Sequence, residues 1–255
     1  MRFHPAACML KPSLLLSHGF ANSSAEWAEC QALLGPVAET VLLGAHTVTE
    51  HAAWADRFRR STWQDWGQPV VDRYTALAQS HPVSLGLIST SASLILMALA
   101  SGQLQPLPQH IVLVDPLIEA RHRWRLRTVG LWGPLVRTVD WTAGKAPEEY
   151  VNTYKTVPYE ALKQLHKLCQ GCARIQTLPA VPMTVFVSRQ DPVVNSDSTQ
   201  RFFRRYPWVQ VHVLDSQLHA MVRLKGRPNV TDQDYQNQSA IVAALRCCIP
   251  GATQS

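Results

Sequence analysis

The chain has 255 residues, of which 46% are hydrophobic and 16% are charged, and its formal net charge is +6. This length and composition fit one large globular domain with a sizeable core. No run approaches the roughly 18 apolar residues needed to span a bilayer. Much of the positive excess falls in one segment, so the charge does not indicate a nucleic-acid partner.

The predicted elements alternate between strand and helix along the chain. Strands are expected at 13–17, 40–43, 83–88, 111–114, 183–187 and 209–214, and helices at 25–34, 62–80, from Leu94 onward, 198–206 and 239–248. This alternation predicts an α/β fold with a mostly parallel, doubly wound sheet whose strands are joined by right-handed crossovers. Functional residues in such sheets lie at the carboxyl ends of the strands.

The first predicted strand ends at His18-Gly19-Phe20 and opens into a polar loop. Gly19 allows the backbone to approach a bound group closely. The backbone N–H of Phe20 is then free to point into a pocket, where it would stabilise a developing negative charge. An ordinary turn into the following helix is compatible with the same residues. His18-Gly19-Phe20 therefore indicates a functional site only together with the other residues described below.

The segment from Pro82 to Ala100 is interpreted as an apolar strand, a tight turn of small hydroxyl residues and an apolar helix. A serine at such a bend is typical of a nucleophile elbow, usually written Gly-x-Ser-x-Gly. Ser89 is the predicted nucleophile, which places Leu87 and Ser91 at the two glycine positions. Ser91 is the alternative nucleophile, because it has small residues on both sides. A serine-rich helix N-terminus without chemistry is the competing interpretation.

The segment 119–178 contains no good strand and is too long for a simple loop. It is interpreted as a small helical cap inserted between the two parts of the core, 1–118 and 179–255. Its second half, from Tyr150 to Leu168, is predicted to be helical, with Pro158 near the start of a helix.

The first half of this predicted cap is basic and aromatic. Four arginines lie between Arg121 and Arg127, and no acidic residue occurs between Glu119 and Asp140. Such a surface is suited to weak contact with an anionic membrane surface or with an acyl substrate. A solvated charged face beside packed tryptophans is the simpler interpretation.

Six cysteines occur, at positions 8, 30, 169, 172, 247 and 248. The apolar stretch at the start of the chain is too short for a signal peptide, so free thiols in a reducing, cytoplasmic setting are expected. Cys169 and Cys172 form a lone C-x-x-C pair. Without a second pair or a strand-to-helix context, they are expected to lie at an ordinary helix end rather than at a zinc or redox site.

Three polar residues in the order Ser89, Asp191 and His219 each follow the end of a predicted strand. A serine hydroxyl is a weak nucleophile and needs a neighbouring base. Imidazole is suited to that role near neutral pH, and a carboxylate fixes its tautomer and stabilises its charged form. The sequence therefore predicts a Ser-His-Asp catalytic triad in the chain order that is found on α/β-hydrolase sheets.

The sequence resembles the α/β-hydrolase superfamily, and within it the bacterial monoacylglycerol lipase and carboxylesterase group. The resemblance covers most of the chain, is weakest in the cap, and rests on Leu14–Phe20, Thr62–Trp66, Ser89–Ala92, Ser188–Val194 and His219. It implies the α/β-hydrolase fold, attack of the serine on an ester carbonyl, and an oxyanion held by the backbone N–H groups of Phe20 and Thr90. It implies no metal and no organic cofactor.

The expected activity is hydrolysis of carboxylic esters, either short to medium acyl esters or monoacylglycerol-like lipids, through an acyl-enzyme. One alternative keeps the fold with amidase, carbon–carbon hydrolase or acyltransferase chemistry. The other is a non-catalytic protein of the same fold that binds a hydrophobic ligand or a partner, which the bulky Leu87 at a tight position of the elbow favours.

Overall fold

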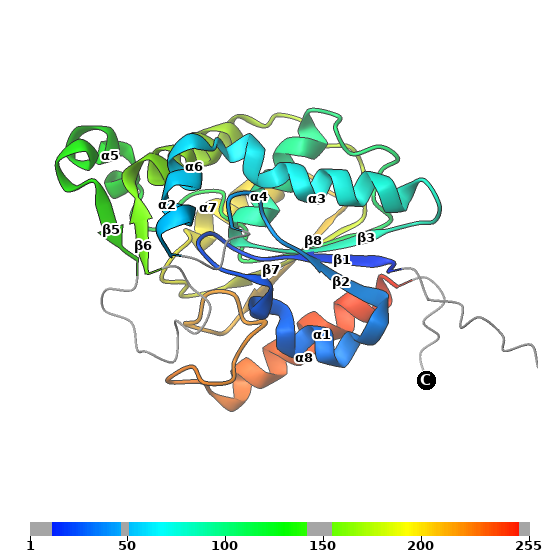
Figure 1. Cartoon of the computed structure of the whole chain (residues 1–255). Helices are drawn as coiled ribbons and strands as arrows, with labels where there is room; N and C mark the ends of the chain where they lie inside the picture. Colours follow the sequence, from blue (N-terminus) through cyan, green and yellow to red (C-terminus); the bar gives the residue numbers. More distant parts are fainter. Residues whose placement is uncertain (1–11, 47–50, 142–154, 250–255) are drawn as a thin grey trace, which may run out of the picture.

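The computed structural model describes residues 12–46, 51–141 and 155–249, and of residues 51–54 the backbone only. Its centre is a six-stranded sheet in the order β2-β1-β3-β4-β7-β8, with every neighbouring pair parallel (Figure 1). The strands are β1 (Leu14–Ser17), β2 (Ala38–Val41), β3 (Ser84–Ile88), β4 (Ile111–Val114), β7 (Met183–Ser188) and β8 (Val209–Leu214). The predicted α/β fold with a doubly wound parallel sheet is confirmed.

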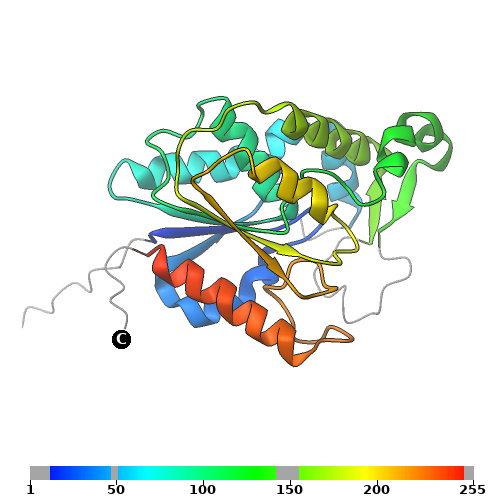
Figure 2. The ribbon, with the colours of Figure 1, turned by 180° about the vertical axis from the view of Figure 1, so that it is seen from behind.

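Helices cover both faces of the sheet (Figures 1 and 2). One face carries α1 (Ala28–Leu34) and α8 (Asp232–Cys247), and the other carries α3 (Trp63–Ala78), α4 (Ser89–Ala100), α6 (Tyr159–Arg174) and α7 (Ser196–Phe203). The remaining helices are the 3₁₀ turns η1 (Ser24–Trp27) and η2 (Gly35–Val37), with α2 (His51–Arg60) and α5 (Arg123–Val136). In the described residues no helix combines the length and the apolarity that crossing a membrane requires.

The two-sided covering explains why the central strands are apolar at nearly every position. Leu14 and Leu16 belong to the core under α1 and α8, whereas Leu15 between them belongs to the core under α3 and α4. All three side chains are 0% exposed. A strand buried on both faces has no polar face, so it appears in the sequence as a continuous apolar run rather than as an alternating one.

The chain reverses its direction across the sheet between β1 and β3. From β1 it passes outward to β2, and it then returns to place β3 on the other side of β1. In open α/β sheets the crevice for ligands lies outside the carboxyl ends of the strands at such a switch point. Both Gly19, which follows β1, and Ser89, which follows β3, therefore lie at the position that the topology favours for a site.

Most predicted elements are present, and the differences are at their ends. β2 begins two residues before the expected 40–43 strand, and α4 begins at Ser89, so that the hydroxyl residues expected in a turn before Leu94 belong to the start of the helix. α8 begins at Asp232 instead of Ser239, because Thr231 and Asp234 form a reciprocal capping box. Helix α2 was not predicted from the sequence.

The expectation that segment 119–178 contains no strand is wrong. Two three-residue strands, β5 (Thr138–Asp140) and β6 (Thr156–Pro158), pair antiparallel there. Such short strands leave little signal in a sequence, because three residues cannot establish an alternating pattern. The helix expected at 150–168 begins at Tyr159 as α6, directly after Pro158 in extended conformation, and residues 150–154 lie outside the described residues.

The C-x-x-C pair lies in the last turns of α6, as the sequence predicted. Cys172 is buried, with its thiol 3.6 Å from the carbonyl oxygen of Ser93. Burial raises the pKa of the Cys169 thiol to about 12 and also raises that of Cys172. The five cysteines within the described residues are free. Thiols held in the protonated state are poor metal ligands and poor nucleophiles, so this pair serves packing.

The close approach of β3 to α8 depends on a glycine without a side chain. A Cβ on Gly86 would lie 2.6 Å from Leu16 Cδ2 and 2.8 Å from Leu245 Cδ2. We expect Gly86→Ala to lower the free energy of unfolding by about 1–3 kcal/mol, as overpacking of a dense core does. Denaturant unfolding measures this change.

Gly130 on α5 is the matched control, because a Cβ there would meet nothing within 4 Å. Gly130→Ala is expected to raise the free energy of unfolding by about 0.5–1 kcal/mol through better helix propensity. Equal effects of the two substitutions would contradict the packing argument.

Candidate active site

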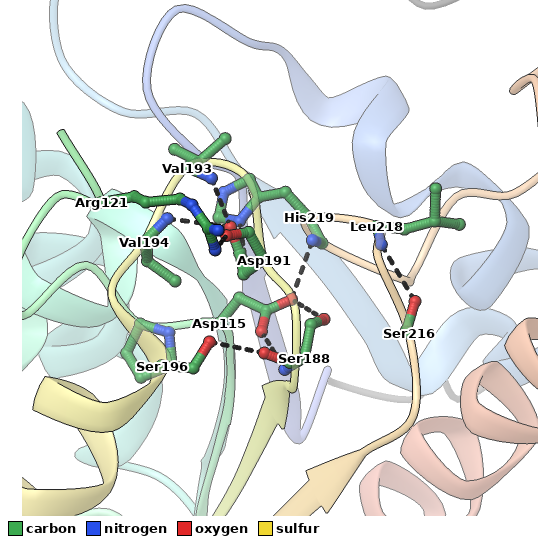
Figure 3. Close-up of polar contacts among 12 residues, drawn as sticks. Asp115, Arg121, Ser188, Asp191, Val193, Val194, Ser196, Ser216, Leu218 and His219 are labelled. Atoms are coloured by element: carbon green, nitrogen blue, oxygen red, sulfur yellow. Dashed lines mark hydrogen bonds and ion pairs between the residues drawn. The ribbon is translucent and has the colours of Figure 1, made fainter.

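Asp191 and His219 are brought together from two strand ends (Figure 3). The Nδ1 atom of His219 lies 2.7 Å from Asp191 Oδ2. The other carboxylate oxygen, Oδ1, accepts the backbone N–H groups of Val193 at 2.6 Å and Val194 at 2.8 Å. Asp191 is fully buried, so its carboxylate is held in a single orientation toward the imidazole.

The loops that carry this pair are fixed by polar contacts to other segments. The Arg121 guanidinium donates to the backbone carbonyl of Asp191 at 2.9 Å. Ahead of the histidine, the Ser216 hydroxyl donates to Asp234 at 2.5 Å and accepts the N–H of Leu218 at 3.0 Å. Ser216 thus ties the turn before the histidine to the first turn of α8.

Ser89 occupies the sharp bend between β3 and α4. Its φ angle is +50°, in the left-handed region that non-glycine residues rarely adopt. This is the backbone strain expected of a nucleophile elbow. Leu87, at the first crowded position of the elbow, is 0% exposed and packs within the core under α3 and α4, so the bend accommodates its side chain.

Ser91 lies on the inner side of the same bend, away from the cavity described below. Its side chain is fully buried, and its hydroxyl is 2.9 Å from the carbonyl oxygens of both Ser17 and Ile88. The same hydroxyl accepts the backbone N–H of Ile88 at 2.9 Å. Ser91 therefore ties the end of β3 to the end of β1, and these contacts argue against its use as a nucleophile.

A cavity of about 1150 Å³ opens beside these residues. Among the residues that line it are Ser89, His219, Phe20 and Thr90. Within the described parts of the chain, neither Ser89 Oγ nor His219 Nε2 has a hydrogen-bond partner. The serine hydroxyl and the outer nitrogen of the imidazole are thus both available to a molecule in this cavity.

Two buried histidines, His18 and His46, form hydrogen bonds with the loop that follows β1. His18 Nδ1 donates to the Gly19 carbonyl at 2.8 Å, and its Nε2 accepts the N–H of Leu43 at 3.2 Å. In the same way His46 Nε2 accepts the N–H of Ala21 at 3.1 Å. Burial lowers the pKa of His18 to about 4 and lowers that of His46, so both rings are neutral and act as hydrogen-bonding supports.

Asp115 is a second buried carboxylate beside the pair, and it is not among the site residues predicted from the sequence. One oxygen accepts the Ser188 N–H at 2.7 Å, and the other accepts the Ser188 hydroxyl and the Ala220 N–H, each at 2.9 Å (Figure 3). It therefore connects the end of β7 to the histidine loop. The sequence does contain a signal, because Asp115-Pro116 comes directly after β4 and a second Asp-Pro pair, Asp191-Pro192, comes shortly after β7.

The charges around the imidazole favour its protonated form. Burial alone lowers the pKa of His219, but the carboxylates of Asp191, Asp115 and Glu26 outweigh burial and raise it. For Asp115, burial and the neighbouring Asp191 raise the pKa well above its ordinary value. A histidine with a raised pKa that lines the same cavity as a serine hydroxyl is suited to take up a proton from a group bound there.

Asp115, Asp191 and His219 also resemble a metal-ligand set, since each offers one ligand atom and these atoms lie within 4.8 Å of one another. However, all four carboxylate oxygens already accept hydrogen bonds from the protein. The contacts describe a hydrogen-bonded network better than an open coordination site, in which ligand oxygens face a vacant position.

No protein-family model matches this sequence, and no curated protein matches it. Solved structures do. A structure of the metagenome-derived lipolytic enzymes LipS and LipT superposes with a TM-score of 0.72 at 18% identity, covering 93% of this chain and 95% of that one. The monoacylglycerol lipase of Paleococcus ferrophilus gives 0.69 at 11% identity, covering 92% and 95%. A soluble variant of monoglyceride lipase from Saccharomyces cerevisiae gives 0.72 at 13% identity, covering 99% and 90%. The chain thus has the α/β-hydrolase fold.

The pairing of Asp191 with His219 can be tested without a substrate. Asp191→Asn removes the charge that contributes most to raising the pKa of His219. We therefore expect the His219 pKa, followed by NMR titration of the imidazole protons, to fall in this variant.

Asp197→Asn is the control, because it removes the same charge from an exposed position in the first turn of α7. This substitution should leave the pKa of His219 unchanged. An unchanged His219 pKa in Asp191→Asn would mean that the two side chains are not paired in solution.

Proposed function

We propose that this protein is a serine hydrolase that cleaves carboxylic esters through Ser89, His219 and Asp191. The observation that carries the proposal is the 2.7 Å contact between His219 and Asp191 beside a cavity that Ser89 also lines. The strained φ of +50° at Ser89 supports it, because strain of this kind concentrates at functional sites. The lipolytic enzymes among the proteins of similar fold lend further support.

In the proposed acylation step, Ser89 Oγ attacks the ester carbonyl carbon while His219 Nε2 removes its proton. Asp191 keeps the other ring nitrogen protonated and stabilises the imidazolium that forms. The protonated imidazole then gives its proton to the leaving alcohol, which departs and leaves an acyl group on Ser89. Water repeats the sequence in deacylation, with His219 again acting as the base.

The negative charge on the carbonyl oxygen would be held by the backbone N–H groups of Phe20 and Thr90. Both residues line the cavity, and the N–H of Thr90 is in the first turn of α4, where amides have no partner within the helix. The positive end of the helix dipole adds to the stabilisation. Within the described residues, the Phe20 N–H has no acceptor either.

The lining of the cavity suits an ester with one apolar and one polar part. Apolar side chains come from the segment between β4 and β7, namely Leu117, Leu126, Trp141 and Leu165. Polar ones come mainly from the segment after β8 and the first turn of α8, among them Gln217, Asn229 and Gln233. We infer an acyl chain of short to medium length, or a monoacylglycerol-like lipid. No observation favours an amide or a carbon–carbon bond as substrate.

Substitution of the serines separates the two candidate nucleophiles. Ser89→Ala should lower kcat for p-nitrophenyl esters by at least about a thousandfold and abolish labelling by a fluorophosphonate probe, because the attacking oxygen is gone. Ser91→Ala should keep the labelling and instead lower the free energy of unfolding by about 1–3 kcal/mol, since it leaves buried backbone groups unpaired.

The opposite pattern, with labelling lost only in Ser91→Ala, would replace the proposed nucleophile. A wild-type protein that neither hydrolyses esters nor reacts with the probe would favour the non-catalytic binding protein.

We propose that the segment 119–178 serves as a cap over the cavity. Helix α5 projects from the body of the molecule together with β5 and β6 (Figure 1). Arg125 and Leu126 of α5 line the cavity. On the outside, Trp124, Leu131 and Leu135 are 60%, 81% and 87% exposed. Their spacing places them along one stripe of the helix.

The exposed stripe suits weak contact with an anionic lipid surface. Arg123, Arg127 and Arg137 accompany it and are also exposed, and the sequence has no acidic residue from 120 to 139. Apolar side chains flanked by arginines favour binding at the headgroup boundary of a bilayer, where anionic lipids attract the charges. An ester substrate dissolved in the lipid would then lie next to the cap.

Vesicle sedimentation tests this contact. We expect binding to phosphatidylcholine vesicles that contain phosphatidylglycerol, and weaker binding to phosphatidylcholine alone. Replacing Arg123 and Arg127 by Gln should weaken the binding to anionic vesicles by roughly fivefold per charge, and replacing Leu131 and Leu135 by Ser should weaken it more than tenfold.

Leu107→Ser, at another exposed apolar residue, is the control and should bind like the wild type. Equal binding to both kinds of vesicle would contradict the proposal that the arginines attract anionic lipids. A different outcome is that the wild type binds no vesicles but self-associates, and that replacing Leu131 and Leu135 abolishes the self-association. The exposed stripe would then be an interface with a second copy of this chain.

The proposed location remains the cytoplasm. Cys30, Cys172 and Cys248 are buried free thiols, and burial raises the pKa of each. Free buried cysteines are typical of proteins kept in a reducing compartment.

A further inference from the structure

Glu26 is a buried carboxylate within the cavity that the proposed mechanism does not use. It lies in η1, directly after the loop that leaves β1, and is 8% exposed. The next residue anchors this segment to the sheet, because Trp27 Nε1 donates to the Ser17 carbonyl at 2.8 Å. Charged residues are rarely buried without a partner, so the contacts of Glu26 need an explanation.

The carboxylate is bound to the backbone next to the proposed nucleophile. Glu26 Oε2 accepts the Gly19 N–H at 2.7 Å. A Cβ on Gly19 would lie 3.4 Å from Ser89 Cβ and 3.5 Å from Glu26 Oε2. Glu26, Gly19 and Ser89 therefore converge at one corner of the cavity.

The peptide between Gly19 and Phe20 is fixed from both sides by these contacts. Its carbonyl oxygen, on Gly19, accepts from His18 Nδ1 at 2.8 Å. The preceding amide, the N–H of Gly19, is held by Glu26. In a trans peptide the N–H points opposite to the carbonyl. The N–H of Phe20 consequently points away from His18, and its direction depends on both anchors.

Glu26 also acts on the imidazole through its charge. Burial raises the pKa of Glu26, against the opposing effects of the Gly19 N–H, His219, Arg227 and Asn22. In turn, Glu26 is one of the three carboxylates whose charges raise the pKa of His219, with Asp191 and Asp115. His18 on the other side of the loop is neutral near pH 7.

We propose that Glu26 is a positioning residue that orients the Gly19–Phe20 peptide for oxyanion binding and places a buried negative charge in the cavity that His219 also lines. The inference rests on the proposed ester hydrolysis for its first part only. The second part concerns the effect of this charge on the proton affinity of the imidazole, which is measurable whether or not the protein hydrolyses an ester.

Two substitutions separate the acceptor from the charge. Glu26→Gln keeps an oxygen that can accept the Gly19 N–H but removes the charge, whereas Glu26→Ala removes both. We expect kcat for a soluble p-nitrophenyl ester to fall about 10- to 100-fold in Glu26→Ala with KM little changed, and to stay within about threefold of the wild type in Glu26→Gln.

The charge has its own readout. Both variants should lower the His219 pKa in an NMR titration and move the acidic limb of the kcat/KM profile to lower pH, because the base must be neutral to act. A residue with a merely structural role would shift neither. Circular dichroism and thermal unfolding confirm that each variant is folded, and Glu26→Gln, close to isosteric, keeps the test valid should Glu26→Ala unfold.

Glu29→Gln and Glu29→Ala are the matched controls. Glu29 lies one helical turn further along and accepts the N–H groups of Leu224 and Lys225, outside the cavity lining. Glu29→Ala should lower the free energy of unfolding through the loss of those bonds, but neither control should change the His219 pKa or the pH dependence of kcat/KM.

The inference is overturned if the His219 pKa is unchanged in both Glu26 variants, if they lose kcat equally, or if the loss appears in KM alone. These outcomes are distinct from failure of the proposed function. If the proposed function fails, the wild type itself shows no ester hydrolysis and no fluorophosphonate labelling. The NMR titration of His219 in the two Glu26 variants still tests the effect of the Glu26 charge.

Discussion

The hydrogen bond between His219 and Asp191 is the interaction from which the arrangement of the candidate site follows. Its two partners are 28 residues apart and follow different strands, so the bond exists only because β7 and β8 run parallel and end at the same edge. With Nδ1 held by the carboxylate, Nε2 is left for the cavity. The contacts of Arg121, Val193 and Val194 with Asp191, and of Ser216 with Leu218, hold the two loops that carry this pair.

Several residues in the loops that converge at this edge have a strained backbone conformation. Ala21, Ser89, Asp115 and Ala220 all have positive φ angles between 44° and 57°, and each lies just beyond or close to the end of a sheet strand. Residues other than glycine adopt this region at some cost, and the surrounding structure must compensate. Here the compensation is a set of short polar contacts, such as the Ala220 N–H to Asp115 and the Ala21 N–H to His46.

The same edge collects three carboxylates around one imidazole. Two of them, Asp191 and Asp115, are fully buried, and Glu26 is nearly so. Their oxygens are occupied mainly by backbone N–H groups, which stabilise negative charge without adding a cation. This explains how a buried histidine can have a raised pKa although burial alone lowers it. The electrostatics of the site are thus carried by loops that the sequence separates widely.

The sequence by itself determined the layered architecture, because continuous apolar runs such as 111–114 and 183–187 have the length and composition of strands covered on both faces. It also identified Ser89, Asp191 and His219 as residues at strand ends. Tertiary structure alone decided that the Ser91 hydroxyl lies 2.9 Å from two carbonyl oxygens, that Asp115 lies within 4.8 Å of the imidazole, that Glu26 lines the same cavity, and that β5 pairs with β6. The reason is physical: periodicity and turn chemistry are local properties of the chain, whereas a hydrogen bond between distant loops depends on how strands pair and where their ends converge.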